Sequence, residues 1–203
     1  MITPMESAKK QNIQNSRIDL SQMSASQAAK TLLGFELVRQ FPRGVARVRI
    51  VETEAYDQSD AASHSYNGQT QRTEVMFGEA GHLYVYFTYG MHYCCNIVVG
   101  PKGYGAAVLI RAVEPISGDS FMLQNRQGKD GVELSNGPAK LCQALQIDKT
   151  LNGHNLQRNP LKLIDNTPLS DDQIITTTRI GISKAIDEPW RFYVNGNPYV
   201  SSR

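Results

Sequence analysis

Two short segments of the chain combine residue types that can carry out chemistry, VETEAY at 51–56 and YVYFTYG at 84–90. The first segment ends a predicted strand with Glu54 and an aromatic residue. The second segment holds three tyrosines: Tyr84, Tyr86 and Tyr89. A carboxylate can take a proton from water, and tyrosine rings can stack on a flat group. Together the segments indicate an acid–base step on a flat, electron-rich substrate.

Alternation of side chains along the strand predicted at 45–56 would place Glu54 and Tyr56 on one face. That face begins with Val48 and Ile50, so both functional groups would project from an apolar surface. In the alternative interpretation, Glu54 is a surface carboxylate at a strand end or the partner of a nearby arginine, because such acids are common. The spacing alone leaves both interpretations open.

Arg111 interrupts the apolar run AAVLIRAV at 106–113, which otherwise reads as a strand buried on both faces. A buried guanidinium without a partner costs several kcal/mol, so it needs a carboxylate or a phosphate. The candidates are Glu52, Glu54, Glu114 and, in a complex, a phosphate of a bound nucleic acid. A purely structural ion pair is an equally good interpretation at this point.

Three further residues have both a functional and an ordinary interpretation. Tyr89 precedes Gly90 at a predicted hairpin tip, where a bulky side chain could act as a wedge, although strand tyrosines usually serve packing. His64 lies in a polar loop, where most histidines are simply solvated. Lys140 follows a helix start at Asn136–Gly137–Pro138 that could bind a phosphate, although most helix starts bind nothing.

The elements that must position these residues are predicted from periodicity and from cap and turn residues. A disordered leader is expected at 1–17, and one domain at 18–203. In that domain the sequence predicts a helix from Ser24 to Gly34, a loop at 57–73, helices at 114–127 and 138–146 (with Ser135–Gly137 as capping residues), and a loop-rich region at 152–170. Strands are predicted at 35–40, 45–56, 82–88, 93–99, 106–113, 191–194 and 199–202, the last two joined by an Asn195–Gly196 turn. The fold class is therefore α+β, a curved, mostly antiparallel sheet flanked by helices, with a protruding hairpin.

Composition narrows the class of protein only slightly. A net charge of +2 permits a nucleic-acid partner without requiring one, and four arginines clustered at 39–49 could equally be a solvated face. Three cysteines and four histidines fit neither a disulfide framework nor a metal-ligand pattern, so we expect no metal and no cofactor. No apolar run approaches about 18 residues, which predicts a soluble, cytoplasmic protein without membrane contact.

Seven segments taken in order resemble the alkyladenine (3-methyladenine) DNA glycosylase family. They are VETEAY at 51–56, ASHS at 62–65, VMFG at 75–78, LYVYFTYGMHYCCN at 83–96, LIRAVEP at 109–115, NGPAKLCQALQI at 136–147 and WRFYV at 190–194. The resemblance extends from about Ala28 to Ser201 and leaves only the leader uncovered. VETEAY and YVYFTYGMHYC are its most specific motifs.

The resemblance implies a role for each candidate residue. Glu54 would be the general base that deprotonates the attacking water, and Arg111 would hold that water and the carboxylate. The extruded base would lie among Tyr56, His64 and Tyr86. Tyr89 would fill the gap left in the duplex, and Asn96 would oppose guanine by clashing with its 2-amino group. Contacts to the DNA backbone would come from Arg72, Met91 and Lys140, although Gln71 and Thr73 beside Arg72 depart from the family pattern.

The function that this resemblance implies is that of a monofunctional DNA glycosylase, a hydrolase that flips alkylated or deaminated purines out of double-stranded DNA. It would leave an abasic site and initiate base excision repair. Schiff-base lyase activity is not expected, since no lysine occupies the corresponding place. We expect a monomer, associated with the nucleoid if the source is bacterial. Which lesion is preferred depends on the pocket, because one-atom discrimination is worth only about 1–3 kcal/mol.

Parts of the sequence also suggest two other functions. A non-catalytic nucleic-acid-binding module of similar fold is the main alternative, because the architecture also resembles a tRNA-binding domain of formyltransferases and fold alone does not set function. A sugar hydrolase that uses Glu52 and Glu54 as a carboxylate pair fails on geometry. Residues two apart on one strand face lie about 7 Å from each other on the same side, with no opposed face for a substrate.

Overall fold

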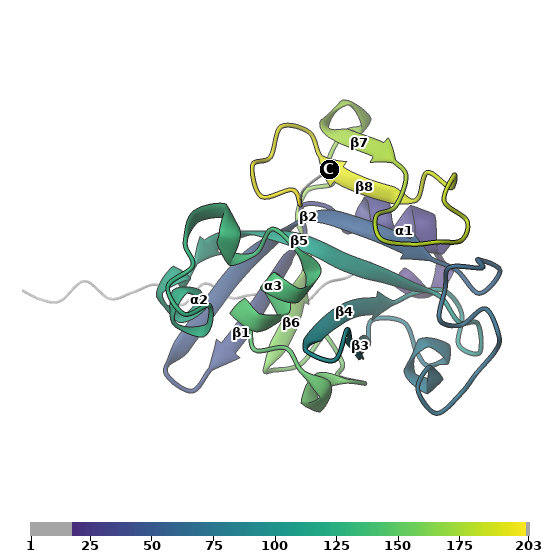
Figure 1. Cartoon of the computed structure of the whole chain (residues 1–203), viewed down its shortest axis with the longest axis horizontal. Helices are drawn as coiled ribbons and strands as arrows, with labels where there is room; N and C mark the ends of the chain where they lie inside the picture. The colour runs from purple at the N-terminus through teal and green to yellow at the C-terminus, as the bar shows by residue number, and fades with distance from the viewer. Residues whose placement is uncertain (1–17, 202–203) are drawn as a thin grey trace, which may run out of the picture.

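A curved antiparallel sheet forms the centre of the molecule, shown in Figure 1 as a computed structural model that describes residues 18–201. The leader predicted at 1–17 lies outside the described residues. The strands are β1 (Glu36–Phe41), β2 (Gly44–Tyr56), β3 (Leu83–Thr88), β4 (His92–Val98), β5 (Ala107–Ser117), β6 (Leu161–Ile164), β7 (Ile174–Thr177) and β8 (Arg191–Val194). Their order is β3-β4-β5-β2-β1-β6, and β8 pairs with both β2 and β7. Every pairing among these strands is antiparallel, which confirms the predicted fold class.

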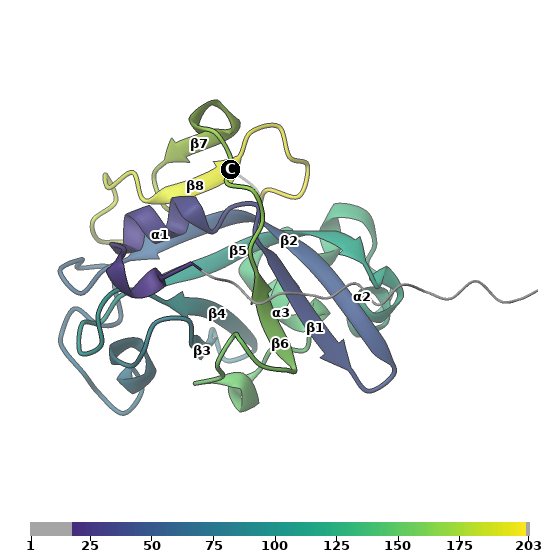
Figure 2. The same cartoon turned by 180° about the vertical axis from the view of Figure 1, so that it is seen from behind.

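Within residues 18–201, three short α-helices pack against this sheet, α1 (Ala25–Thr31), α2 (Asp119–Asn125) and α3 (Pro138–Ala144). The helix predicted after Ser24 is confirmed. The Ser24 hydroxyl accepts from the Gln27 N–H, and the Gln27 side chain accepts from the Ser24 N–H, a reciprocal cap. Helix α1 lies across β2 and β5 (Figure 2), whereas α3 packs against β4 and β5.

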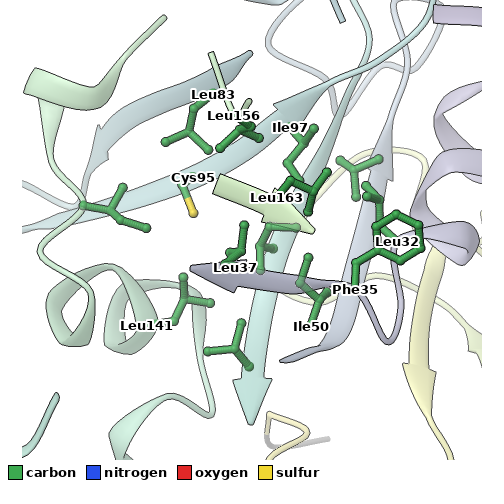
Figure 3. Packing of buried hydrophobic residues seen from close by; sticks show 14 of the residues in the cluster. Leu32, Phe35, Leu37, Ile50, Leu83, Cys95, Ile97, Leu141, Leu156 and Leu163 are labelled. Atoms are coloured by element: carbon green, nitrogen blue, oxygen red, sulfur yellow. The ribbon is translucent and has the colours of Figure 1, made fainter. Parts of the chain in front are cut away.

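The main hydrophobic core lies inside the curve of the sheet, where side chains from both of its ends converge (Figure 3). Leu83 of β3 and Leu163 of β6 come from opposite ends of the strand order and share one cluster. The segment 153–156 joins these ends, because the Leu83 N–H donates to His154 O at 2.9 Å and the Leu163 N–H donates to Leu156 O at 2.8 Å. The sheet is therefore rolled around its core like a partly closed barrel.

Two irregularities in the pairing of β2 with β5 decide which face carries the functional groups. Ile50 pairs with Val113 and Glu52 with Ala112, so Val51 has no opposite residue, and one pair further along Arg111 has none. A bulge of this kind shifts the side-chain alternation of the bulged strand. Val48 and Ile50 accordingly point into the core before the bulge, and Ala55 does so after it.

The prediction that Glu54 and Tyr56 share the face of Val48 and Ile50 is therefore wrong. Strict alternation fails because Ile50 and Ala55 lie five positions apart, an odd number, although both are in the core. Glu54 and Tyr56 project instead from the opposite face, into a cavity. The alternation predicted for β3 is confirmed, since Leu83 and Val85 face the core while Tyr84 and Tyr86 do not join that cluster.

Four sequence predictions of elements need correction. The helix predicted at 114–127 covers only 119–125, because 114–117 continue β5 alongside β2. Ser135 and Asn136 do not cap α3, whose N-cap residue is Gly137 without a side-chain cap. The strand predicted at 199–202 is absent from the described residues, and β8 pairs instead with β7, a four-residue strand too short for a periodic signal. The same limit explains β6, which the loop-rich prediction at 152–170 omitted.

Gly118 follows β5 at the start of α2 and provides a test of how closely this turn packs on β2. Its φ is +82°, and a Cβ there would lie 2.4 Å from the Val45 carbonyl oxygen. Gly128 also has a φ of +82°, but nothing lies within 4 Å of its Cβ position. We expect Gly128→Ala to lower the free energy of unfolding by about 1–2 kcal/mol, from backbone strain alone. Gly118→Ala should cost a further ~1–3 kcal/mol from the added contact. Urea unfolding of both variants checks this, and equal losses would contradict it.

Candidate active site

A cavity of about 500 Å³ opens on the face of the sheet opposite the core, between the β3–β4 hairpin and two loops. The loops contribute residues 61, 62 and 64, and residues 180–184. All the residues that the sequence predicted as catalytic, base-binding or intercalating line this one cavity: Glu54, Tyr56, His64, Tyr86, Tyr89, Asn96 and Arg111. They come from β2, from the β3–β4 hairpin, from β5 and from the loop that holds His64. The bulge in the pairing of β2 with β5 turns the Glu54 carboxylate toward the aromatic side chains.

Glu54 is fully buried at the base of the cavity, and donors surround its carboxylate. Arg111 Nη1 lies 3.1 Å from Oε1, and the backbone N–H of Ile180 donates to the same oxygen at 2.8 Å. The Tyr56 hydroxyl donates to Oε2 at 2.8 Å. Three donors therefore fix the orientation of this carboxylate at the base of the cavity.

Arg111 is held on its other side by a second buried carboxylate, that of Glu52. Its Nε donates to Glu52 Oε1 at 3.0 Å, and its Nη2 donates to the Ser201 hydroxyl at 3.3 Å. Burial opposes the charge of Arg111, but the two carboxylates outweigh it and raise the pKa of the guanidinium. Of the candidate partners, Glu52 and Glu54 both contact Arg111, whereas Glu114 pairs with Arg49 at 3.0 Å.

Glu52 takes no part in lining the cavity and serves as an anchor. Its Oε1 accepts from Arg191 Nε at 2.6 Å and from the Ser201 hydroxyl at 2.9 Å, and its Oε2 accepts from the Ser201 N–H at 2.6 Å. Four groups, two of them cationic, therefore fix one carboxylate that is fully enclosed. This arrangement locks the position of Arg111, and it leaves Glu52 without access to a substrate.

The aromatic side chains form a wall on the hairpin side of the cavity. Tyr84 and Tyr86 stack with ring centroids 5.7 Å apart, and His64 meets Tyr86 edge-on at 4.6 Å. His64 Nδ1 lies 3.1 Å from the Tyr84 hydroxyl, so this histidine is fixed against the wall although part of its ring is exposed. Partial burial, and then the nearby Arg72 guanidinium, lower the pKa of His64, so its imidazole is neutral at pH 7.

The phenols of this wall stay protonated. Burial, followed by the Glu54 carboxylate, raises the pKa of Tyr56, and burial raises the pKa of Tyr86 in the same direction. A protonated Tyr56 can donate its hydrogen bond to Glu54, as the 2.8 Å distance between the two oxygens requires. Neutral rings also leave Glu54 as the only anionic side chain that lines the cavity within the described residues.

The tip of the β3–β4 hairpin exposes apolar side chains beside the cavity. Tyr89 is 83% exposed and Met91 is 69% exposed, and Tyr89 has a φ of +51°, unusual for any residue other than glycine. Phe87 is exposed on the hairpin as well, packed on Tyr93 with ring centroids 5.0 Å apart. Strained and exposed apolar groups gathered at one tip indicate a surface for contact with another molecule.

The remaining predicted residues differ in how free they are to bind. Asn96 is buried, and its Nδ2 donates to Tyr84 O at 3.1 Å. Lys140 lies near the start of α3, where its Nζ contacts both Glu133 and Asn136 at 2.8 Å. Arg72 is exposed, with its guanidinium 5.8 Å from the centroid of the Tyr86 ring. Contacts of these side chains with DNA stay predictions.

Sequence reasoning missed a buried ion pair behind the cavity, Asp60 with Arg179. Arg179 Nη1 contacts one carboxylate oxygen, and Nη2 donates to the other at 3.0 Å. The two residues are 119 positions apart, so no local pattern links them. Asp60 also lies in the segment predicted as a surface loop, a prediction that is wrong in part because Asp60, Ser63, Ser65 and Thr73 are buried. Only the polar composition of that loop, unusual for a buried segment, could have drawn attention to it.

Other features of the cavity and chain bear on the chemistry. Among residues 18–201, no cluster of His, Cys, Asp or Glu side chains could hold a metal ion, and no helix in that range is long and apolar enough to cross a membrane. The three cysteines are buried and unpaired, and burial raises the pKa of Cys94 to about 11. One lysine, Lys184, lines the cavity, and its side chain is exposed.

Comparison with known proteins agrees with this geometry. The sequence profile of the methylpurine-DNA glycosylase family matches residues 19–198. A protein of Carboxydothermus hydrogenoformans is 51% identical over 176 residues, which cover 86% of this chain and 92% of the relative. A protein of Methanoculleus marisnigri is 50% identical over 178 residues (86% and 92%), and one of Francisella tularensis is 47% identical over 179 residues (87% and 93%). All three relatives are provisionally named 3-methyladenine DNA glycosylases.

A buried carboxylate facing a wall of tyrosines, on a rolled antiparallel sheet, defines the class of protein as one with a pocket for a flat group beside an acidic side chain. The match over residues 19–198 then gives the family directly. This chain belongs to the methylpurine-DNA glycosylase family, and it is thereby a DNA glycosylase that acts in the repair of alkylated bases.

Proposed function

We propose that the chain flips alkylated or deaminated purines out of duplex DNA and hydrolyses their N-glycosidic bond, which leaves an abasic site and initiates base excision repair. The observation that carries the proposal is the position of Glu54. Its carboxylate is buried at the base of a cavity of about 500 Å³ and is oriented by Arg111, Tyr56 and the Ile180 N–H. Family membership supplies the substrate class, DNA with a damaged purine.

In this proposal the aromatic side chains hold the extruded base. A base inside a duplex cannot reach a buried carboxylate, so the nucleotide must first rotate out, at a cost of a few kcal/mol that a lesion reduces. Tyr56, His64 and Tyr86 would enclose the base, and Asn96 would oppose the 2-amino group of guanine. Purine nucleotides alkylated at N3 or N7 are cationic, and the neutral rings of the wall would attract them by about 0.5–2 kcal/mol.

The chemical step needs one base and one water. Glu54 accepts a proton from water as the water oxygen bonds to C1′, and the electrons of the broken C1′–N bond leave with the purine. Arg111 orients the carboxylate and the water. A base that is already cationic leaves readily, so no further acid is required for such lesions. Because this step forms no covalent intermediate, the direct product is an abasic sugar.

We propose that the enzyme has no lyase activity, although Lys184 lines the cavity. Amines that form Schiff bases are activated by desolvation or by a neighbouring cation, whereas the Lys184 side chain is exposed. Treatment of an enzyme–DNA mixture with borohydride should therefore trap no covalent complex. We further propose that the chain acts as a monomer in the cytoplasm, at the nucleoid if it is bacterial, since that is where its substrate lies.

Single-turnover assays on duplex oligonucleotides test the proposal. Each duplex carries one 3-methyladenine, 7-methylguanine, hypoxanthine or ethenoadenine, and alkali reveals abasic sites as strand breaks. We expect base release from at least one lesion, with strand breaks appearing only after alkali. If the protein binds these duplexes but leaves every lesion intact, a non-catalytic binding module replaces this proposal.

Tyr89 at the hairpin tip should act as the wedge that fills the space left by the extruded nucleotide. We expect Tyr89→Ala to slow base release from a paired lesion by about tenfold or more, since the wedge offsets part of an unstacking cost of a few kcal/mol. Release from a single strand should change much less, because no gap needs filling there. Phe87→Ala is the matched control, an exposed aromatic on the same hairpin outside the cavity. Equal effects of Tyr89→Ala on both substrates would contradict the wedge role.

A further inference from the structure

Two loops that are distant in the sequence form the outer wall of the cavity, and one ion pair connects them. Asp60 lies in the first loop and Arg179 begins the second. Their side chains are 1% and 0% exposed. Both carboxylate oxygens of Asp60 bind the guanidinium, a two-point contact that fixes orientation as well as distance. The two loops are therefore tied together by a charged pair that solvent does not reach.

Arg179 also contacts the Tyr56 ring and the backbone beside Glu54. Its Cζ lies 4.7 Å from the centroid of the Tyr56 ring, and since Arg179 does not line the cavity, it covers the rear of that ring. Its Nη1 donates to the carbonyl of Ala55, between Glu54 and Tyr56, at 2.8 Å. The next residue along, Ile180, donates its N–H to Glu54 Oε1 at 2.8 Å.

We propose that Asp60 and Arg179 are positioning residues for base excision, which hold the Tyr56 ring and the Glu54 carboxylate in place without touching the substrate. The inference rests on the proposed function of the cavity. With the pair broken, Arg179 loses the carboxylate that fixes its guanidinium, which weakens its contacts with Ala55 and Tyr56. The second loop can then shift and move the Ile180 N–H away from Glu54. Reacting groups tolerate little displacement, since a shift of about 1 Å can cost roughly 100-fold in rate.

Two conservative variants separate charge from geometry. Asp60→Asn keeps the shape of the side chain and removes its charge. Arg179→Lys keeps the charge but loses the two-point contact and the planar cover of Tyr56. The matched control is Glu36→Gln, which breaks the partly buried pair of Glu36 with Arg47 (2.6 Å) between β1 and β2, outside the cavity. For each variant the folded fraction is measured by circular dichroism, so that rates refer to folded protein.

Two readouts on DNA distinguish positioning from a merely structural role. The first is the single-turnover rate of base release, and the second is the affinity for a duplex with a tetrahydrofuran abasic analogue, which has no base to stack. We expect both variants to lower the rate by about 10–100-fold with the affinity for the analogue little changed. Glu36→Gln should lower only the melting temperature. Wild-type rates in folded Asp60→Asn and Arg179→Lys, or an equal loss of rate and affinity, would overturn the proposal.

A third readout needs no substrate. Trp190 is the only tryptophan of the chain, and its ring centroid lies 5.2 Å from the Arg179 guanidinium. We expect its emission to shift to longer wavelength in Asp60→Asn as the loops separate, and unchanged emission would contradict the tie. If the wild type itself releases no base, the proposed function fails, while the emission of Trp190 still decides whether the pair holds the loops.

Discussion

Replacement of Glu54 by glutamine should lower the single-turnover rate of base release by roughly 10²–10⁴-fold, the range typical of a general base. Glutamine fills the same space, and its side-chain oxygen can still accept from the Ile180 N–H, as Glu54 Oε1 does at 2.8 Å. What it loses is the negative charge that takes the proton from water. Binding of the lesion duplex should persist, because the aromatic wall and the hairpin tip are unchanged.

The matched control for Glu54→Gln is Glu114→Gln. Glu114 belongs to β5 and pairs with Arg49 at 3.0 Å, in a partly exposed contact outside the cavity. We expect this variant to release bases at the wild-type rate. The assay compares both variants in enzyme excess on one duplex, with binding measured separately. A Glu54→Gln enzyme that retained most of its rate would require another residue as the base.

Replacement of Arg111 by methionine should have the largest effect on stability, about 3–5 kcal/mol, because it leaves the carboxylates of Glu52 and Glu54 buried without their shared cation. Base release by the folded fraction should fall as well, since Arg111 orients Glu54. Urea unfolding followed by circular dichroism measures the first effect. Single-turnover assays below the transition measure the second.

Arg49→Met is the control for Arg111→Met. Its partner Glu114 is partly exposed, and ion pairs of this kind contribute only about 0–1 kcal/mol. We therefore expect a small change in the free energy of unfolding and an unchanged rate. Similar losses in the two variants would mean that the buried network around Glu52 contributes no more than a surface pair.

Local patterns in the sequence predicted the parts of the fold that local interactions determine. The helix after Ser24 is marked by its own cap and apolar stripe, and the β3–β4 hairpin by alternation on both sides of Gly90. The longer helix predicted from Glu114 was wrong, because pairing of 114–117 with β2 overrides local preference. Strands of four residues, such as β6 and β7, carry too few side chains for any period to show.

The candidate site shows the same difference between what local sequence predicts and what long-range contacts determine. Residue types and family resemblance identified the groups that line the cavity, because these stand in short distinctive motifs. The contacts that support these groups were missed. They are the ion pair of Asp60 with Arg179 and the hydrogen bonds of Arg191 and Ser201 to Glu52. Each of these contacts joins positions more than a hundred residues apart, and only the folded chain brings them together.

Val51 and Arg111 have no opposite residue in the pairing of β2 with β5. These two extra residues also determine which insertions and deletions this region can accept. Substitutions between Ile50 and Glu54 change one side chain at a time, and the neighbours can adjust. Deletion of one residue there would leave β2 without the residue that matches the extra one, Arg111, in β5, and would shift Glu52 and Glu54 relative to the guanidinium that they share. Insertions and deletions in this stretch should therefore be far rarer among functional descendants of this sequence than replacements, and the spacing itself is a heritable part of the active site.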